Sequence, residues 1–234
     1  MERTLSSWKF IIIILAIVVV LIALWFVVPT VKKQIDHVQY MASHYVTQTT
    51  LTDEQRSTIE QSIRDIESEI ASGDTKDEPT MTMQYIDLGI HFASLGRNDL
   101  SLDAYKRAAN ADPTSFVAFS NIGSVHEAAG NYEDAKDAYR QAISKAPTES
   151  SNYQKLAELY WYHLDEVAVA RGVFIEGLMG TNQDPNLMRA YALFLEQNNY
   201  LSESLLYWQE IAKQSPDDAR IQEHINSLLP TPTP

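Results

Sequence analysis

The middle of the chain repeats itself with a period of about 34 residues. Residues 82–115 and 116–149 are identical at eight aligned positions. The clearest pairs are Gly89 and Gly123, Gly96 and Gly130, Tyr105 and Tyr139, Ala108 and Ala142, and Pro113 and Pro147. A repeat of this length is one supersecondary unit, which buries its apolar face only by stacking on its neighbours. We therefore expect a stack of short repeated units.

Small and rigid residues indicate how each unit is built. Gly89 and Gly123 fall in the middle of predicted helices, where glycine costs about 0.8 to 1 kcal/mol relative to alanine. A neighbouring helix is therefore expected to approach closely at both positions. Ala135 and the paired alanines are small enough for the same purpose. Pro113 and Pro147 prevent the second helix of each unit from continuing.

These residues resemble the tetratricopeptide repeat (TPR), a helix hairpin of about 34 residues. In the first copy the pattern is carried by Tyr85, Leu88, Gly89, Phe92, Gly96, Tyr105, Ala108 and Pro113. In the second copy it is carried by Phe119, Ile122, Gly123, Gly130, Tyr132, Ala135, Tyr139, Ala142 and Pro147, with His126 in place of one aromatic residue. The resemblance implies an all-α fold, a right-handed α-solenoid of helix hairpins.

Two weaker copies follow, and they set the expected domain boundaries. The third needs one extra residue near Asp165 and about three more before Pro185, and the fourth matches at fewer positions. We expect a repeat domain over residues 81–217, divided into 82–115, 116–149, 150–183 and 184–217. Residues 218–229, with Ile221 and Ile225 on one side, are expected to form a helix that caps the stack. Residues 230–234, which alternate Pro and Thr, are expected to be a short tail.

A long apolar segment precedes the repeats. The nineteen residues from Phe10 to Val28 contain no charge, and sixteen of them are Leu, Ile, Val or Phe. As a helix the segment is about 28 Å long, close to the roughly 30 Å core of a bilayer. Trp8 and Trp25 suit the two interfaces, and Pro29 ends or kinks the helix. The segment predicts a single-pass transmembrane helix that contacts lipid, after a tail of residues 1–9.

A cleaved signal peptide is the alternative interpretation of this segment. Its apolar run exceeds the stretch of roughly 7 to 15 residues that is usual in such signals, and no small-x-small cleavage site follows, so we favour an uncleaved anchor. Arg3 and Lys9 on one side balance Lys32 and Lys33 on the other, so the positive-inside rule does not decide the orientation. Because the amino-terminal tail is short, we expect it to stay inside and the repeats to be extracytoplasmic.

Residues 29–80 are predicted to form juxtamembrane helices and a linker. The sequence from Thr52 to Gln55 has the form of a capping box, and a helix from there is expected to end at Gly73. Its apolar stripe is Ile59, Ile63, Ile66 and Ile70. The stripe spans two heptads, fewer than a coiled coil needs, so it either packs on the next domain or forms a homo-oligomer. The charged segment of residues 73–80 is expected to be a linker.

Composition and motifs argue against several function classes. The net charge is −13, and no basic run offers a phosphate-binding patch, so we expect no nucleic-acid partner. The chain has no cysteine, which excludes disulfides, thiolate metal sites and a cysteine nucleophile. The common nucleotide-binding, hydrolase and zinc-protease motifs are missing too. We expect no enzyme activity, no catalytic residues, no cofactor and no metal.

The TPR resemblance implies a partner-binding groove along the first helix of each hairpin. Mapped onto this chain, the groove positions are Met83, Ile86 and Ile90; Val117, Ser120, Ser124 and Glu127; Gln154, Glu158, Trp161 and Tyr162; and Met188, Ala192, Leu195 and Glu196. The residues with which some relatives clamp a terminal carboxylate are replaced, so that ligand class is not expected. An apolar groove with several glutamates suits an amphipathic or mildly basic segment, with Trp161 and Tyr162 as anchors, unless these two pack between helices.

Together these features predict a membrane-anchored scaffold that binds a protein or peptide partner near the bilayer. Tethering would raise the effective concentration of both partners. Two rival functions fit the same sequence. The protein is a holdase-type chaperone for translocating or membrane chains, or it is a structural spacer that oligomerises through the stripe of Ile59 to Ile70.

Overall fold

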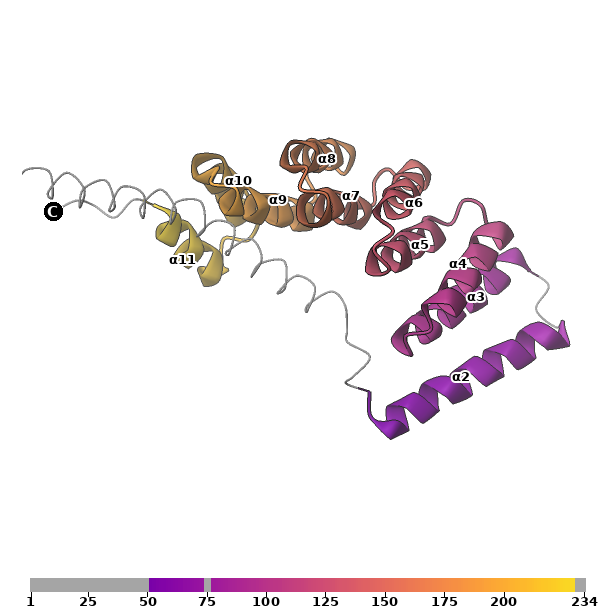
Figure 1. The fold of residues 1–234 in the computed structure, drawn as a ribbon. Coiled ribbons are helices and arrows are strands. Elements are labelled where there is room, and N and C mark those ends of the chain that lie inside the picture. Colours follow the sequence, from indigo (N-terminus) through magenta and orange to yellow (C-terminus); the bar gives the residue numbers. More distant parts are fainter. Residues whose placement is uncertain (1–50, 74–76, 230–234) are drawn as a thin grey trace, which may run out of the picture. The chain divides into compact units, whose positions relative to one another are not determined.

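The computed structural model describes residues 51–73 and 77–229 (Figure 1). Within these residues it contains ten α-helices and one π-helix, and no strand. They are α2 (Asp53–Ser72), α3 (Glu78–Ser94), α4 (Asn98–Ala111), α5 (Phe116–Ala128), α6 (Tyr132–Lys145), α7 (Ser150–Glu158), the π-helix η2 (Leu159–His163), α8 (Val167–Gly180), α9 (Pro185–Gln197), α10 (Leu201–Gln214) and α11 (Ala219–Leu228).

The predicted membrane segment, residues 10–28, lies outside the described residues, as do the tails 1–9 and 230–234 and the part of the juxtamembrane region before residue 51. Of the helices in the described ranges, none is both long and apolar enough to span a bilayer.

Helix α2 begins and ends as its sequence predicts. The Thr52 N–H donates to Gln55 Oε1 at 2.9 Å, and the Gln55 N–H donates to Thr52 Oγ1 at 3.1 Å. These two bonds form a capping box. Gly73 terminates the helix in the left-handed region, with φ of 69°, as glycine commonly does at this position. The isoleucine stripe packs inside the chain, because Ile63 is buried in a cluster with Leu88 and Phe92.

Helix α3 starts earlier than the predicted linker allows. Its first residue is Glu78, and the Asp77 side chain accepts a hydrogen bond from the Thr80 N–H at 3.3 Å. Asp77 is therefore an N-cap. Pro79 lies in the first turn of the helix instead of in the linker. Proline is well tolerated there, because the amide it lacks would have no partner in the helix.

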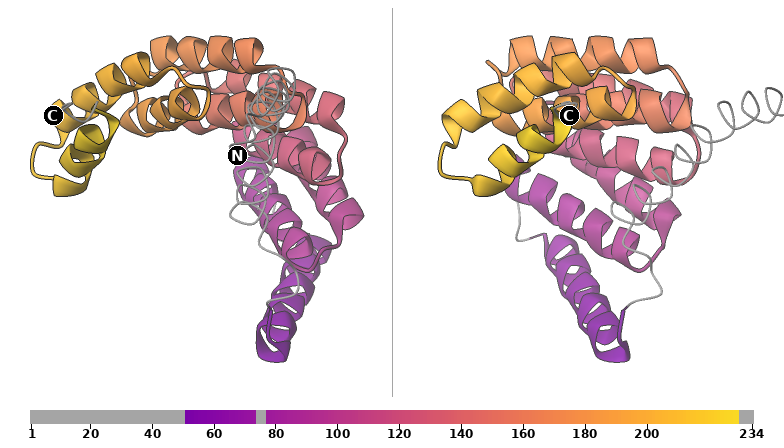
Figure 2. Two further views of the ribbon diagram at one scale, coloured as in Figure 1. Left: turned by 60° about the vertical axis from the view of Figure 1, so that its left-hand side comes forward. Right: turned by 90° about the vertical axis from the view of Figure 1, so that its left-hand side faces the viewer.

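The helices after α2 pack as consecutive antiparallel pairs. The pairs are α3 with α4, α5 with α6, α7 and η2 with α8, and α9 with α10. In Figure 1 the second helices α6, α8 and α10 lie along one side of the first helices α5, α7 and α9. Figure 2 shows the same two layers from other sides. The described chain is thus an all-helical solenoid of hairpins.

The turn inside each hairpin uses a residue in the left-handed region. Gly96 and Gly130 have φ of 72° and 77°, and Asp165 and Asn199 have φ of 58° and 63° at the matching turns. Glycine adopts this conformation without a Cβ clash, and Asp and Asn tolerate it better than other side chains. The weaker sequence copies therefore keep the turn geometry with different residues.

The extra residue of the third copy is absorbed in the helix and not in the turn. Residues Leu159–His163 form a single π-turn that continues α7, and the Leu164 N–H bonds to the Leu159 carbonyl at 3.2 Å. A π-turn is what results when one residue is inserted into an α-helix. The insertion rotates the following side chains, so that Trp161 faces the core and His163 faces α5.

Close helix approach in the first two hairpins depends on glycine facing tyrosine. A Cβ added to Gly89 would lie 2.3 Å from Tyr105 Cε1, and one added to Gly123 would lie 2.5 Å from Tyr139 Cε1. Neither distance is compatible with a side chain, so the two glycines leave space for the rings. Ala108, Ala135 and Ala142 are completely buried in the same interfaces.

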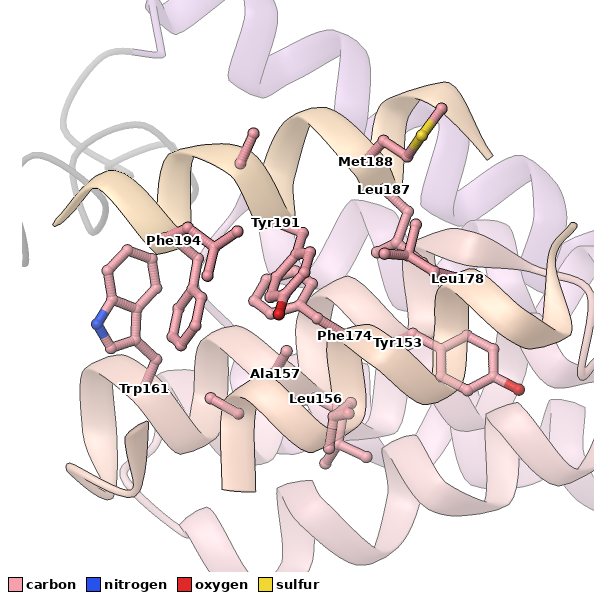
Figure 3. Packing of buried hydrophobic residues seen from close by; sticks show 14 of the residues in the cluster. Tyr153, Leu156, Ala157, Trp161, Phe174, Leu178, Leu187, Met188, Tyr191 and Phe194 are labelled. Carbon is pink, nitrogen blue, oxygen red and sulfur yellow. The ribbon is translucent and has the colours of Figure 1, made fainter. Parts of the chain in front are cut away.

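The second half of the chain has a larger, aromatic core. One continuous cluster joins α6 to α11 and includes Trp208. Its members Trp161, Phe174, Tyr191 and Phe194 are labelled in Figure 3. Helix α11 completes it, because its Ile221 and Ile225 are buried against this cluster. The last helix thus covers apolar surface that would otherwise end the stack exposed.

Candidate partner-binding surface

The first helices α3, α5 and α7 form a continuous face that carries exposed apolar side chains. Helix α3 contacts α5, and α5 is joined to α7 by hydrogen bonds. On this face Met83 is 64% exposed, Ile90 45% and Val117 37%, while Ile86 is half-buried between them. We call these four residues the apolar face. Their side chains are available to a partner without any rearrangement of the core.

A lysine outside the mapped groove positions lies beside the apolar face. Lys155 Nζ donates to Ser124 Oγ at 3.1 Å and to Ser120 Oγ at 3.2 Å, which ties α7 to α5. Burial lowers the pKa of the Lys155 ammonium, while the carboxylates of Glu127 and Glu158 act in the opposite direction. Lys155 is the single base within α7, and this is the signal that the sequence offers for it.

The two mapped residues that flank Lys155 on α7 pair with each other. Gln154 Nε2 donates to Glu158 Oε1 at 2.9 Å, and both residues are half-buried. Together with Ser124, which is also half-buried, they form a polar border next to the apolar face. This arrangement of an apolar centre with hydrogen-bonding groups at one side is common in protein interfaces.

Glu127 is an internal residue and does not reach the surface. It is 4% exposed, accepts a hydrogen bond from Tyr139 Oη at 2.6 Å, and its Oε1 lies 3.0 Å from His163 Nε2. His163 in turn stacks on Tyr132 at 4.6 Å. The π-turn brings this histidine to α5, so the carboxylate joins the second and third hairpins instead of contacting a partner.

The remaining mapped positions lie in the core. Met188, Ala192 and Leu195 are completely buried, and Trp161 is 6% exposed in edge contact with Phe194 (Figure 3). Tyr162, half-buried, stacks on Trp161 at 4.1 Å between ring centroids. These side chains therefore pack between helices, and Ser120 is buried as well. The accessible part of the mapped surface belongs to the first three hairpins.

Glu196 occupies the position in α9 that corresponds to Glu127, and it is also paired internally. It accepts hydrogen bonds from Trp208 Nε1 and from Ser204 Oγ, the latter at 3.0 Å, and lies 3.0 Å from His224 Nε2. The last contact reaches α11. Both glutamates thus hold a later part of the stack to an earlier one.

A separate pocket lies between α2 and the first hairpin. It has a volume of about 370 Å³ and is lined by Glu60, Ile63, Arg64, Glu67, Phe92, Arg97 and Leu100. The Arg97 guanidinium and the Glu60 carboxylate are 3.3 Å apart across it. Its floor is apolar and its rim carries charges of both signs, so it favours no particular class of ligand.

Comparison with known proteins agrees with this architecture. The family described as "Tetratricopeptide repeat" matches residues 45–224. Among solved structures, MamA is similar with a TM-score of 0.54 and 19% identity, covering 72% of this chain and 96% of that one. A thermophilic TPR protein from Thermus thermophilus has a TM-score of 0.53 and 16% identity, covering 84% and 97%. No curated protein matches the chain significantly. Because the family match spans most of its length, the chain belongs to the tetratricopeptide repeat family.

Proposed function

We propose that this protein is a membrane-anchored scaffold whose TPR domain docks an amphipathic peptide or helix on the face of α3, α5 and α7. The observation that carries the proposal is the exposure of Met83, Ile90 and Val117 on adjacent first helices. TPR proteins bind protein or peptide partners. No step of bond making or breaking is part of this function.

The chemistry of the face defines the partner. The apolar face offers contacts to one side of a helix, at the spacing of successive helical turns. The bordering Gln154, Glu158 and Lys155 offer hydrogen bonds to a polar flank. The partner is therefore a segment with one apolar and one polar side, and not a chain terminus held by a basic clamp.

The anchor in this proposal is the segment of residues 10–28. Its content of Leu, Ile, Val and Phe favours bilayer insertion by roughly 5 to 10 kcal/mol. The short amino-terminal tail stays inside, and the TPR domain lies on the extracytoplasmic side. Such an anchor holds the docking face close to the membrane, where a membrane-bound partner is concentrated.

Site-specific photo-crosslinking in the full-length protein in its membrane tests the docking face. A photo-reactive amino acid at Ile90 should yield one discrete crosslinked partner, and the same group at Lys106 on α4 should not. Ile90→Glu should abolish the crosslink formed from Val117, whereas Leu206→Glu, on α10, should leave it intact. Equal crosslinking from Ile90 and Lys106 would contradict the proposal. Many unrelated products from Ile90 would favour the holdase function.

The absence of cysteine provides a test of the anchor and its orientation. Two full-length variants, Ser6→Cys and Asn110→Cys, carry one thiol each. In intact cells a membrane-impermeant maleimide should label only Asn110→Cys, and after lysis it should label both. The protein should also stay in the membrane fraction after alkaline carbonate washing. Release of the protein by carbonate would contradict the membrane anchor. Labelling of Ser6→Cys alone in intact cells would show the opposite orientation.

A further inference from the structure

The outward side of α8 is chemically unlike that of the second helices α4 and α6. Only Arg171 and Glu176 of its 14 residues are charged. A row of exposed residues, Ala168, Gly172, Ile175 and Met179, follows the helix at spacings of four, three and four. Ile175 is 40% exposed and Met179 is 76% exposed. No described helix covers this side of α8 in Figures 1 and 2. We call these four residues the α8 row.

The equivalent sides of α4 and α6 are typical solvated surfaces. Asp103, Lys106 and Arg107 are exposed on α4, and Asp137 and Arg140 are exposed on α6. An amphipathic helix normally places its charges on this side. The α8 row therefore departs from the pattern of the two hairpins that precede it.

Gly172 adds an independent observation. It lies inside α8, where glycine destabilises a helix relative to alanine. The helix glycines Gly89, Gly123 and Gly177 each make room for a neighbouring side chain, but a Cβ added to Gly172 would meet no atom within 4 Å. Its small size has no use within the described part of the chain. A glycine on a helix surface does allow the backbone of a second helix to approach closely.

We propose that the α8 row is an interface with the α8 row of a second copy of this chain, in an antiparallel two-fold arrangement. In that register Gly172 of one copy faces Ile175 of the other, and Ala168 faces Met179. Each large side chain then fills the space above a small residue, and the two-fold axis repeats every contact. The row is therefore complementary in size to itself.

The lack of charge along the row favours the second copy over a charged partner. The chain carries a net charge of −13, so two copies repel each other at their acidic surfaces. Only two residues of α8 are charged, and Arg171 is paired with Glu203 of its own chain at 2.7 Å, so few charges oppose the approach of a second α8. A basic partner would be drawn to the acidic surfaces instead. The same row on another copy matches this one both in its lack of charge and in the sizes of its side chains.

Crosslinking between two tagged forms of the full-length protein tests the arrangement. The forms Gly172→Cys and Ile175→Cys, each with the only cysteine in its chain, are co-expressed with different tags and oxidised to form disulfides, which need Cα atoms within about 7 Å of each other. We expect the mixed pair to crosslink faster than either form alone. Crosslinking mainly between two Gly172→Cys chains would overturn the antiparallel register. No crosslink in any combination, or a crosslink only to another protein, would overturn the interface.

A matched pair of bulky substitutions tests the affinity. Gly172→Trp places an indole in the open space of the row, so the monomer should fold as before, and the dissociation constant of the dimer should rise at least tenfold. Gln141→Trp, at an exposed site on α6, should change neither the fold nor the dimer. Circular dichroism and the melting temperature verify that both variants fold. An unchanged dimer in Gly172→Trp would refute the proposal.

Discussion

The two halves of the repeat domain pack their helices with different kinds of side chain. In α3 to α6, a glycine of the first helix faces a tyrosine of the second helix in each hairpin, and the apolar clusters are small. In α7 to α11, aromatic side chains such as Trp161 and Phe194 fill one large core, and the glycine that faces a tyrosine is Gly177 of the second helix α8. The first half leaves Met83, Ile90 and Val117 exposed on its first helices, whereas the corresponding side of α9 carries Asn186, Arg189 and Leu193, of which only Leu193 is a large apolar residue.

The contrast shows which part of the stack offers apolar surface to a partner. In α3 and α5 one side of each first helix is open and carries large apolar residues. On α7 and α9 the same side is mainly polar, with Gln154, Glu158 and Arg189 on it. The candidate docking face therefore lies where the repeat sequence is most regular, and the irregular half provides rigidity.

Truncating one aromatic residue in each half should give the largest effect and sharpen this contrast. Phe194 is completely buried against Trp161 and Phe174, and Phe92 lies in a cluster that is partly open. We expect Phe194→Ala to lower the free energy of unfolding by about 5 kcal/mol and Phe92→Ala by about 3 kcal/mol. Urea unfolding followed by circular dichroism measures both, with the exposed Leu206→Ala as control. Equal losses would mean that the two cores are equally well packed.

Removing the two matched glutamates should give the next largest effect. Glu127→Ala removes the buried carboxylate that contacts both His163 and the Tyr139 hydroxyl, so we expect a loss of about 3 kcal/mol. Glu196→Ala should cost about 1 kcal/mol, because its site is partly exposed and water can replace the carboxylate. The same unfolding measurement compares them. A larger loss of unfolding free energy for Glu196→Ala than for Glu127→Ala would contradict this order.

Alkaline pH should weaken both halves through buried tyrosines, of which Tyr105 and Tyr191 are the clearest cases. Burial raises the pKa of Tyr105 and of Tyr191 to about 12 from the ordinary value of 10.0. Below pH 10 their neutral forms contribute fully to stability, and this contribution falls as the pH rises towards 12, by up to about 2 to 3 kcal/mol each. Tyr105→Phe and Tyr191→Phe should each flatten the fall in stability measured between pH 9 and 12. An unchanged slope in both variants would contradict this assignment.

Two glycine substitutions should have small effects of opposite sign. In Gly123→Ala the new Cβ collides with the Tyr139 ring, so we expect a destabilisation of about 1 to 3 kcal/mol. In Gly172→Ala the Cβ enters open space, and the gain in helix propensity should stabilise the chain by about 0.5 to 1 kcal/mol. Melting temperatures at low protein concentration report both. Effects of the same sign would contradict the different surroundings of these two glycines.

Much of the fold can be predicted from the sequence, because the signals are local. Period, turn residues and caps identify the TPR family and the start and end of α2, which depend on contacts within a few residues. The register of the fourth repeat cannot be read in this way. Its glycine markers are replaced by Ala192 and Asn199, so the pattern assigns Met188, Ala192 and Leu195 to the groove although they lie in the core.

The candidate surface is predicted only in its first half for the same reason. Met83, Ile90 and Val117 lie where the repeat pattern fixes the side of the helix that they occupy. Sequence mapping misses Lys155, because its position against Ser120 and Ser124 depends on the contact of α7 with α5. Sequence mapping also places the extra residue of the third copy in the turn near Asp165, whereas the structure absorbs it in the π-turn Leu159–His163. An alignment detects that a residue has been added but does not show which turn of helix accommodates it.

The sequence by itself determined the repeat, the turns inside its regular copies and the family, because each depends on the preferences of neighbouring residues. Only the tertiary structure decided which of the mapped residues stay exposed, where the extra residue is absorbed and which glycine has no neighbour within the described chain. These features depend on how side chains distant in sequence share the same volume. Helix periodicity defines which residues share a side, and packing decides whether that side is covered.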